Sequence, residues 1–210
     1  MSGANVVNQK GTYGTQGTSA ASNIPGSRSG SISWTDATGN LWLFGGRGYD
    51  SAGTFGYLND LWKYSGGEWT WIGGSNLTNQ SGTYGTQGTA AASNIPGARF
   101  LSTSCTDAAG NLWLFGGYAY DSTGTPGLLN DLWKYSGGEW TWIGGSNVRN
   151  QNGTYGTQGT SAPGNIPGSR WESICWTDAT GNFWLFGGFG YPSTEFGTSG
   201  DLNDLWKYEP

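Results

Sequence analysis

The residues of this chain that could bind a ligand recur at a fixed spacing. An arginine returns every 71 residues, and an aromatic residue follows two of the three arginines. A guanidinium group pairs with a carboxylate through two parallel hydrogen bonds, and aromatic rings supply flat apolar contact area. This combination suits carboxylates, sugars or peptide backbone. The candidate ligand-binding residues are Arg28, Arg47, Arg99, Phe100, Tyr118, Arg170, Trp171 and Phe189.

The arginines also admit a structural role, in which each side chain hydrogen-bonds to neighbouring backbone carbonyls. Their presence in three equivalent copies favours that role. The aromatic residues are better candidates for a site because they differ between otherwise similar units. The residue after the arginine is Ser29, Phe100 or Trp171, and the residue after a recurring pair of glycines is Arg47, Tyr118 or Phe189.

Carboxylates recur as well, and pairs of carboxylates can serve in acid–base chemistry. Asp36 and Asp60 return in every unit beside a turn or a strand start, where capping of the local backbone is the usual role. Asp50 and Asp121 could bind calcium, but the third unit has Pro192 at that place. The chain has no histidine to act as base or metal ligand. We therefore predict no catalytic residue, no metal site and no cofactor.

The two cysteines, Cys105 and Cys175, occupy neighbouring rather than equivalent positions of the repeat. Residues one position apart in adjacent strands point to opposite faces of a sheet. We therefore expect two buried free thiols rather than a disulfide.

Composition excludes several classes of partner. The 210 residues include 40 Gly but also 13 Trp, 11 Tyr and 8 Phe, enough aromatic surface for a folded core. The formal net charge of −5 comes without a basic run, so we expect no nucleic acid partner. No stretch approaches the roughly 18 apolar residues of a membrane span, so we expect no membrane partner. The sequence does not decide the cellular location of the protein, but its low charge favours an extracellular or cell-surface location.

A threefold repeat supplies the elements that position these residues. The stretch Asn-Leu-Trp-Leu-Phe-Gly-Gly at 40–46 returns at 111–117 and, with one substitution, at 182–188. Aromatic and apolar enrichment between turn residues predicts four strands per unit, in the first unit at 31–35, 41–44, 61–64 and 68–72. The connections at 36–40 and 65–67 are short, whereas 45–60 and the linkers between units are long. In an antiparallel sheet both long connections lie at the same end.

Serial four-stranded antiparallel units predict an all-β fold, a β-propeller. The order Pro-Gly-Ser-Arg at 25–28, the glycine pair at 45–46, Tyr64 and Trp71 resembles the kelch repeat, and it recurs along the whole chain. The resemblance implies one propeller segment, 1–210, with blades at about 28–73, 99–144 and 170–210. Gly/Thr-rich loops at 1–27, 74–98 and 145–169 join them. The kelch period is about 50 residues, so these loops hold most of the extra length, as solvated loops pinned by a tyrosine or as binding ribbons.

Three blades are fewer than the roughly four to eight of a closed propeller. They would leave two apolar blade faces open. The third unit stops after its third strand, at Tyr208, so we expect its blade to lack the outermost strand. A two-residue insertion is expected between 189 and 203, because Asp131 and Asp204 are 73 rather than 71 residues apart. We expect a second copy to complete a six-bladed ring as a homodimer, the alternative being that further blades belong to a longer chain.

The function that follows is a non-catalytic binding or interaction scaffold. Its long-loop end would present the candidate residues to a protein, peptide or glycan partner. The alternative is a structural, self-assembling module without a small ligand. An enzyme is the third reading: the kelch resemblance raises galactose-oxidase-like copper chemistry, but the copper site of that family uses histidines, which this chain lacks.

Overall fold

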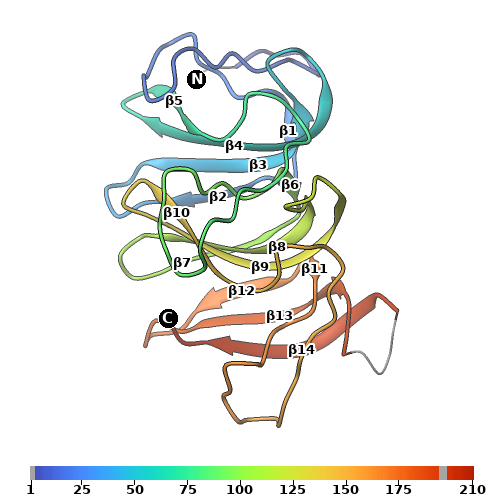
Figure 1. The fold of residues 1–210 in the computed structure, drawn as a ribbon. Helices are drawn as coiled ribbons and strands as arrows, with labels where there is room; N and C mark the ends of the chain where they lie inside the picture. Colours follow the sequence, from blue (N-terminus) through green and yellow to red (C-terminus); the bar gives the residue numbers. More distant parts are fainter. Residues whose placement is uncertain (1–2, 194–197) are drawn as a thin grey trace.

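The computed structural model describes residues 3–193 and 198–210, and the regular elements within them are β-strands (Figure 1). The strands form three antiparallel sheets that follow one another along the chain and lie side by side as blades. The fold is therefore all-β and propeller-like, as the sequence predicts. In these described ranges no helix has the length and hydropathy needed to cross a membrane.

Each blade is built in the order of the chain. In the first, β1 (Arg28–Ser29) and β2 (Ile32–Thr35) share one edge and pair with β3 (Leu41–Tyr49), followed by β4 (Phe55–Ser65) and β5 (Glu68–Gly73). The second blade repeats this with β6 (Arg99–Phe100), β7 (Thr103–Thr106), β8 (Leu112–Tyr120), β9 (Pro126–Ser136) and β10 (Glu139–Gly144). The third contains β11 (Arg170–Trp171), β12 (Ile174–Thr177), β13 (Phe183–Gly190) and β14 (Gly200–Tyr208). The expected insertion overlaps residues 194–197, which lie outside the described residues.

The glycine pair bends a strand instead of ending it. The sequence predicts a long loop over 45–60, but β3 and β4 continue past the glycines and form a hairpin with a short turn. The pairing register shifts between Phe44 and Gly46, and φ is 63° at Gly45 and 99° at Gly46. This is the geometry of a β-bulge, in which positive φ costs glycine nothing. A Cβ at Gly45 would lie 3.0 Å from the carbonyl oxygens of Leu58 and of Arg99 in the next blade.

Adjacent blades pack face to face, and the two faces of a blade differ. We call the side turned to the following blade its forward face, and the side turned to the preceding blade its backward face. The forward face of the first blade contributes Ile32, Trp34, Phe44 and Leu61 to the core. The backward face of the second contributes Leu112, Leu114, Trp133 and Tyr135. Each such side chain stabilises the stack by about 1.5–3 kcal/mol when fully buried.

A disulfide joins Cys105 and Cys175, so the expectation of free thiols was wrong. The two residues do point to opposite faces of their own sheets, as the sequence argument assumed. However, β7 and β12 belong to different sheets that are stacked, and in a stack the forward face of one blade meets the backward face of the next. The two Cα atoms are therefore only 5.9 Å apart, and the disulfide ties the second blade to the third.

The long linkers cover the outer strands of the blades that follow them. In the linker over 74–98, Thr83 pairs with Ile95 as an isolated bridge, and Tyr84 is buried. The Tyr84 ring lies 4.8 Å from that of Trp133 and 5.3 Å from that of Trp142, which is in β10. The tyrosine pins the linker, as predicted, and the pinned segment lies along the blade rather than free in solvent.

The two outermost faces of the stack are open. On the forward face of the third blade Ile174 is 61% exposed, whereas the equivalent Ile32 of the first blade is 7% exposed. On the backward face of the first blade Leu41 is 50% exposed, whereas the equivalent Leu112 of the second is fully buried. The same positions thus form core or surface according to whether a neighbouring blade covers them.

Candidate functional site

The three recurring arginines lie within their blades. Arg99 is buried, and its guanidinium group donates two hydrogen bonds to the carboxylate of Asp131, at 3.0 and 2.7 Å. It also donates to the carbonyl oxygens of Gly97 and Gly116, each at 3.0 Å. Four of the five N–H donors of the side chain are thereby used. This is the structural role that the sequence left open as the alternative to ligand binding.

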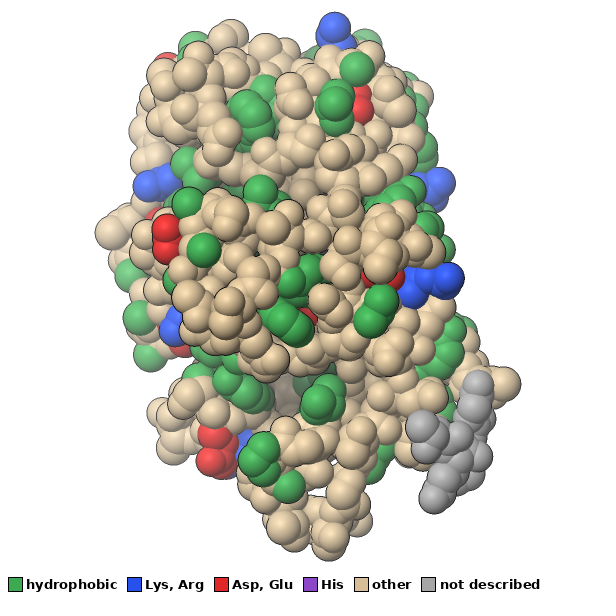
Figure 2. Space-filling model, viewed as in Figure 1, with side chains coloured by type: hydrophobic (Ala, Val, Ile, Leu, Met, Phe, Trp, Pro, Cys, Tyr) green, Lys and Arg blue, Asp and Glu red, His purple; other side chains and the backbone are tan. Residues whose placement is uncertain are grey.

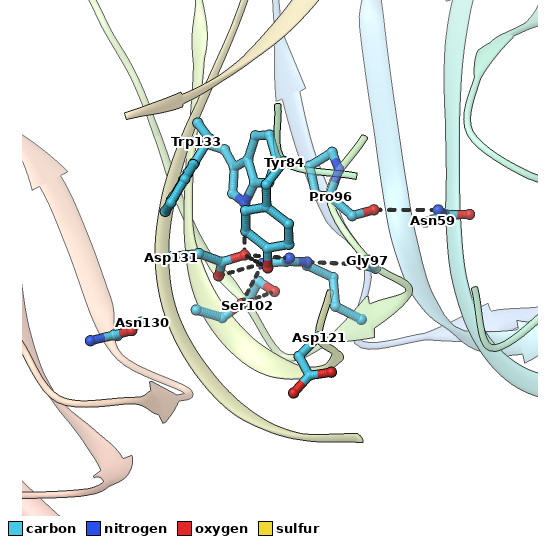
Figure 3. A network of polar contacts seen from close by, with 12 residues as sticks. Asn59, Tyr84, Pro96, Gly97, Ser102, Asp121, Asn130, Asp131 and Trp133 are labelled. Atoms are coloured by element: carbon cyan, nitrogen blue, oxygen red, sulfur yellow. Dashed lines mark hydrogen bonds and ion pairs between the residues drawn. The ribbon is translucent and has the colours of Figure 1, made fainter. Parts of the chain in front are cut away.

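The carboxylate of Asp131 is the centre of this network (Figure 3). The Tyr84 hydroxyl and the Trp133 indole N–H each donate to its Oδ2 atom, at 2.7 Å. Burial raises the pKa of Tyr84 well above its ordinary value, and the negative charge of Asp131 raises it further. The other two blades repeat the arrangement with the ion pairs Arg28–Asp60 and Arg170–Asp204.

The remaining recurrent carboxylates hold turns. The carboxylate of Asp36 accepts hydrogen bonds from the backbone N–H groups of Thr38 and Asn40 and from the Trp42 indole. Asp50 in the same way accepts from backbone N–H groups across the turn between β3 and β4. The capping role predicted for Asp36 is confirmed, whereas the same prediction for Asp60 was wrong, because its carboxylate pairs with the Arg28 guanidinium instead. In the part of the chain that the structure describes, no group of three or more His, Cys, Asp or Glu side chains could hold a metal ion.

The four predicted aromatic residues, together with Tyr57 of the first blade, form a row across all three blades. Tyr57 and Phe100 have ring centroids 4.9 Å apart, and Phe100 and Trp171 are 5.7 Å apart. Tyr118 lies 5.7 Å from Trp171, and Phe189 lies 6.3 Å from Trp171. We call these five residues the aromatic row. Its rings come from β4, β6, β8, β11 and β13, so no single blade could present it.

Backbone geometry holds the row in place. Phe100 pairs with Tyr118 between β6 and β8. Directly after Phe100, Leu101 has φ of 53°, and its N–H donates to the carbonyl oxygen of Gly30 at 2.9 Å. Glu172, at the equivalent place in the third blade, has φ of 54° and donates to the carbonyl oxygen of Leu101 at 3.1 Å. Positive φ is uncommon for such residues and persists where the surroundings enforce it.

Arg47 differs from the other three predicted arginines because it is exposed. Its guanidinium carbon lies 4.8 Å from the ring centroid of Phe55, a cation–π distance. It pairs with Tyr57 in the register of β3 and β4, so its charge lies at the first-blade end of the aromatic row. Burial raises the pKa of Tyr57, the nearby Tyr118 raises it further, and Arg47 opposes both.

Phe55, Tyr57 and Tyr120 also belong to this surface and were not predicted from the sequence. Tyr57 has its ring centroid 5.9 Å from that of Tyr120. A signal was present in the sequence, because the first unit has Tyr57 where the second has Leu128. This is the same kind of difference between units that identified Tyr118. It was overlooked because 45–60 was treated as a loop, in which no side-chain direction could be assigned.

No family model matches this chain, and no curated protein matches it. Among solved structures it is similar to one described as "Novel fungal alcohol oxidase with catalytic diversity among the AA5 family, in complex with copper", with a TM-score of 0.47 and 15% identity. That match covers 90% of this chain and 34% of the other, so this chain spans about a third of its length. A second, "Structure of YjhT", has a TM-score of 0.34 and 12% identity over 88% of this chain and 82% of the other. At these values neither likeness assigns a family, a ligand or an activity to this chain.

Proposed function

We propose that this chain is a non-catalytic binding scaffold of kelch type, which presents the aromatic row to a peptide or glycan. The single observation that carries the proposal is the continuous contact of five aromatic rings drawn from three blades. The hydrophobic core of a single chain does not require a row of aromatic rings at the end of its sheets. Aromatic anchors held by rigid strands are the usual source of binding energy in a recognition surface.

The chemistry of the aromatic row limits the classes of ligand that can bind to it. Trp171 and the face of Phe100 that Tyr57 does not cover offer flat apolar surface, on which a sugar ring or a proline can stack. The hydroxyls of Tyr57 and Tyr118 can donate or accept hydrogen bonds at the edges. Arg47 adds a single exposed positive charge, which suits a carboxylate at one end of the ligand. The ligand class that fits is an extended, weakly acidic peptide or glycan.

A binding array tests this proposal. The protein is screened against glycans and peptides, and affinity for the best ligand is then measured for Phe189→Ala and Phe186→Ala. The two phenylalanines are matched in exposure, at 38% and 40%, but only Phe189 is in the row. We expect Phe189→Ala to weaken binding by about tenfold and Phe186→Ala to leave it unchanged. Equal affinities for both variants would refute the row as the site.

A second candidate function, self-assembly into a ring, has its own observation. Within the chain a forward face packs on a backward face at both blade interfaces, and one face of each kind is left open at the ends. A second copy could cover both in the same way, giving six blades from two chains. Such a dimer is closed and symmetric, which limits further growth.

The mass in solution decides between the two assembly states. We expect a particle of twice 22.2 kDa, and we expect Ile174→Glu combined with Leu205→Glu to reduce it to a monomer, because two charges would be buried without partners. Thr38→Glu, an exposed change outside both end faces, is the matched control and should leave the dimer intact. A folded monomer of the unaltered chain would rule out ring closure, while leaving the aromatic row as a binding surface.

We also propose an oxidising location, at the cell surface or outside the cell. The Cys105–Cys175 disulfide supports it, because such bonds persist in extracellular and other oxidising compartments. Quantifying free thiols in protein isolated under alkylating conditions tests this point.

A further inference from the structure

A cavity of about 260 Å³ lies between the second and third blades, and Figure 2 shows the surface hollowed there. Phe115 and Leu132 line it from the forward face of the second blade. Leu185, Trp206 and Tyr208 line it from the backward face of the third. The cavity is therefore an unfilled part of a blade interface that opens to the molecular surface.

The first interface has a tryptophan at the corresponding place. Trp140 of β10 is buried there, with its ring 5.1 Å from that of Phe44 and 5.0 Å from that of Tyr135. Phe44 and Tyr135 are the repeat equivalents of Phe115 and Tyr208, which line the cavity. The cavity therefore has the position and the lining of an indole site.

The described part of the third blade has no counterpart of the strand that would carry such an indole. β4 pairs with β5, and β9 pairs with β10, along their outer edges. Among the described residues no strand pairs with the outer edge of β14. An exposed edge with unpaired N–H and C=O groups can accept a further strand.

The linker that precedes each blade supplies donors to the outer strand. In the second blade the Gln87 side chain donates to the carbonyl oxygen of Ile143 at 2.9 Å, and the Gly88 N–H donates to that of Trp142 at 2.8 Å. The first blade repeats both bonds, from Gln16 to Ile72 and from Gly17 to Trp71.

In the third blade these donors are present but unused. The equivalents are the Gln158 side chain and the Gly159 N–H, and neither donates a hydrogen bond within residues 3–193 and 198–210. Asn94 of the second linker donates to both Thr89 and Trp140, whereas the equivalent Asn165 donates to Thr160 alone. The linker over 145–169 thus carries the three donors that, in the other two blades, bind the outer strand.

We propose that the outer edge of β14, the cavity and the linker over 145–169 form a receptor for an extended peptide segment. The segment carries two tryptophans two positions apart, as in Glu-Trp-Thr-Trp-Ile, and binds as an antiparallel strand. In the second blade Trp140 pairs with Tyr135, and Trp142 pairs with Trp133. The bound tryptophans accordingly lie opposite Tyr208 and Trp206, and the first has its indole in the cavity, as Trp140 has in the first interface. This receptor is separate from the aromatic row and goes beyond the scaffold function proposed above.

The probe is a fluorescein-labelled peptide, Ser-Gly-Gly-Glu-Trp-Thr-Trp-Ile-Gly-Gly, which copies residues 136–145 of this chain. Fluorescence anisotropy measures its binding to the full chain. We expect saturable binding, and an affinity at least about 100-fold lower for the peptide with both tryptophans replaced by alanine. Equal binding of the two peptides, or no binding up to about 1 mM, would overturn the proposal.

Variants of the linker give a second, independent readout. Gln158→Ala and Asn165→Ala each remove one donor, and we expect each to weaken the peptide about fivefold. Gln16→Ala is the matched control, because its acceptor is in β5 of the same chain, and it should leave peptide affinity unchanged. Phe189→Ala should also leave it unchanged, which separates this site from the aromatic row. If Gln158→Ala and Gln16→Ala have the same effect, the linker is not part of the receptor.

Discussion

Tyr57 of the first blade stacks on Phe100 of the second, with ring centroids 4.9 Å apart and planes inclined by 10°. The contact crosses the boundary between two sheets at the end where the β3–β4 hairpin projects. Arg47 pairs with Tyr57 between β3 and β4, so the contact brings the exposed charge of Arg47 close to the rings of the second and third blades. This pair and the contact between Tyr57 and Tyr118, whose ring centroids are 5.6 Å apart, make the aromatic row continuous across the first boundary.

The stack should couple the two blades energetically. We expect the variants Tyr57→Leu and Phe100→Leu to show an interaction energy of about 1 kcal/mol in a double-mutant cycle, because offset aromatic pairs contribute beyond their buried area. Urea unfolding of the two single variants, the double variant and the parent chain measures it. Strict additivity of the single effects would mean that the rings touch without stabilising the interface.

The ion pair at the centre of the second blade should be costly to break. Asp131→Asn leaves the buried Arg99 guanidinium without a counter-charge, and we expect a loss of about 3–5 kcal/mol in the free energy of unfolding. Arg47→Ala, an arginine change at an exposed site, should cost less than about 0.5 kcal/mol. Chemical denaturation compares the two. Similar small effects of both variants would contradict the buried network as the main support of the blade.

The disulfide should stabilise the contact between the second and third blades. It closes a loop of sequence separation 70, for which chain entropy gives about 4 kcal/mol. We expect Cys105→Ser combined with Cys175→Ser to lower the unfolding midpoint by the same amount as reduction of the parent chain. Thiol titration of the unreduced, denatured protein is the direct check, and two reactive thiols per chain would show the bond to be absent.

Stability should fall at alkaline pH because buried tyrosines resist ionisation. Burial raises the pKa of Tyr135 from 10.0 to about 12. Burial and a hydrogen bond to Asp204 raise that of Tyr155 from 10.0 to about 12. A tyrosine whose pKa is raised on folding contributes fully to folding stability at any pH below its pKa in the unfolded chain. That contribution is lost as the pH rises toward the pKa in the folded chain, here from pH 10 to about 12.

Unfolding midpoints at pH 9 and pH 11 test this alkaline window. Tyr155→Phe keeps the ring but removes the ionisable hydroxyl, so the decline between the two pH values should be smaller in that variant than in the parent chain. An unchanged decline in Tyr155→Phe together with Tyr135→Phe would assign the effect to other groups.

Much of the fold can be predicted from the sequence repeat. Strands such as Ile32–Thr35 and Glu68–Gly73 lie within a residue or two of their predicted bounds, because each is a short apolar run between turn residues. The lengths of β3 and β4 were not predictable in the same way. Gly45 and Gly46 signal a break in any local pattern, and only the partner strand decides whether that break is a loop or a bulge.

The candidate site, too, was predictable from the sequence only in part. Unit-to-unit differences identified Phe100, Tyr118, Trp171 and Phe189, and the structure brings these four together. Spacing could not distinguish the exposed Arg47 from the buried Arg99, because the two differ in what the neighbouring strands place around them. Asp131, the partner of Arg99, is 32 residues away in the chain and reaches it only in the folded blade.

The threefold unit, the strand pattern and the positions at which the units differ depend on local composition and period, so they can be predicted without a structure. What those positions contact depends on how the blades stack. Stacking turned Cys105 and Cys175 toward each other, joined Tyr57 to Phe100, and left a cavity where Trp140 fills the preceding interface. Each of these contacts lies between blades, where the register and order of whole sheets, rather than any local pattern, decide which side chains come within reach.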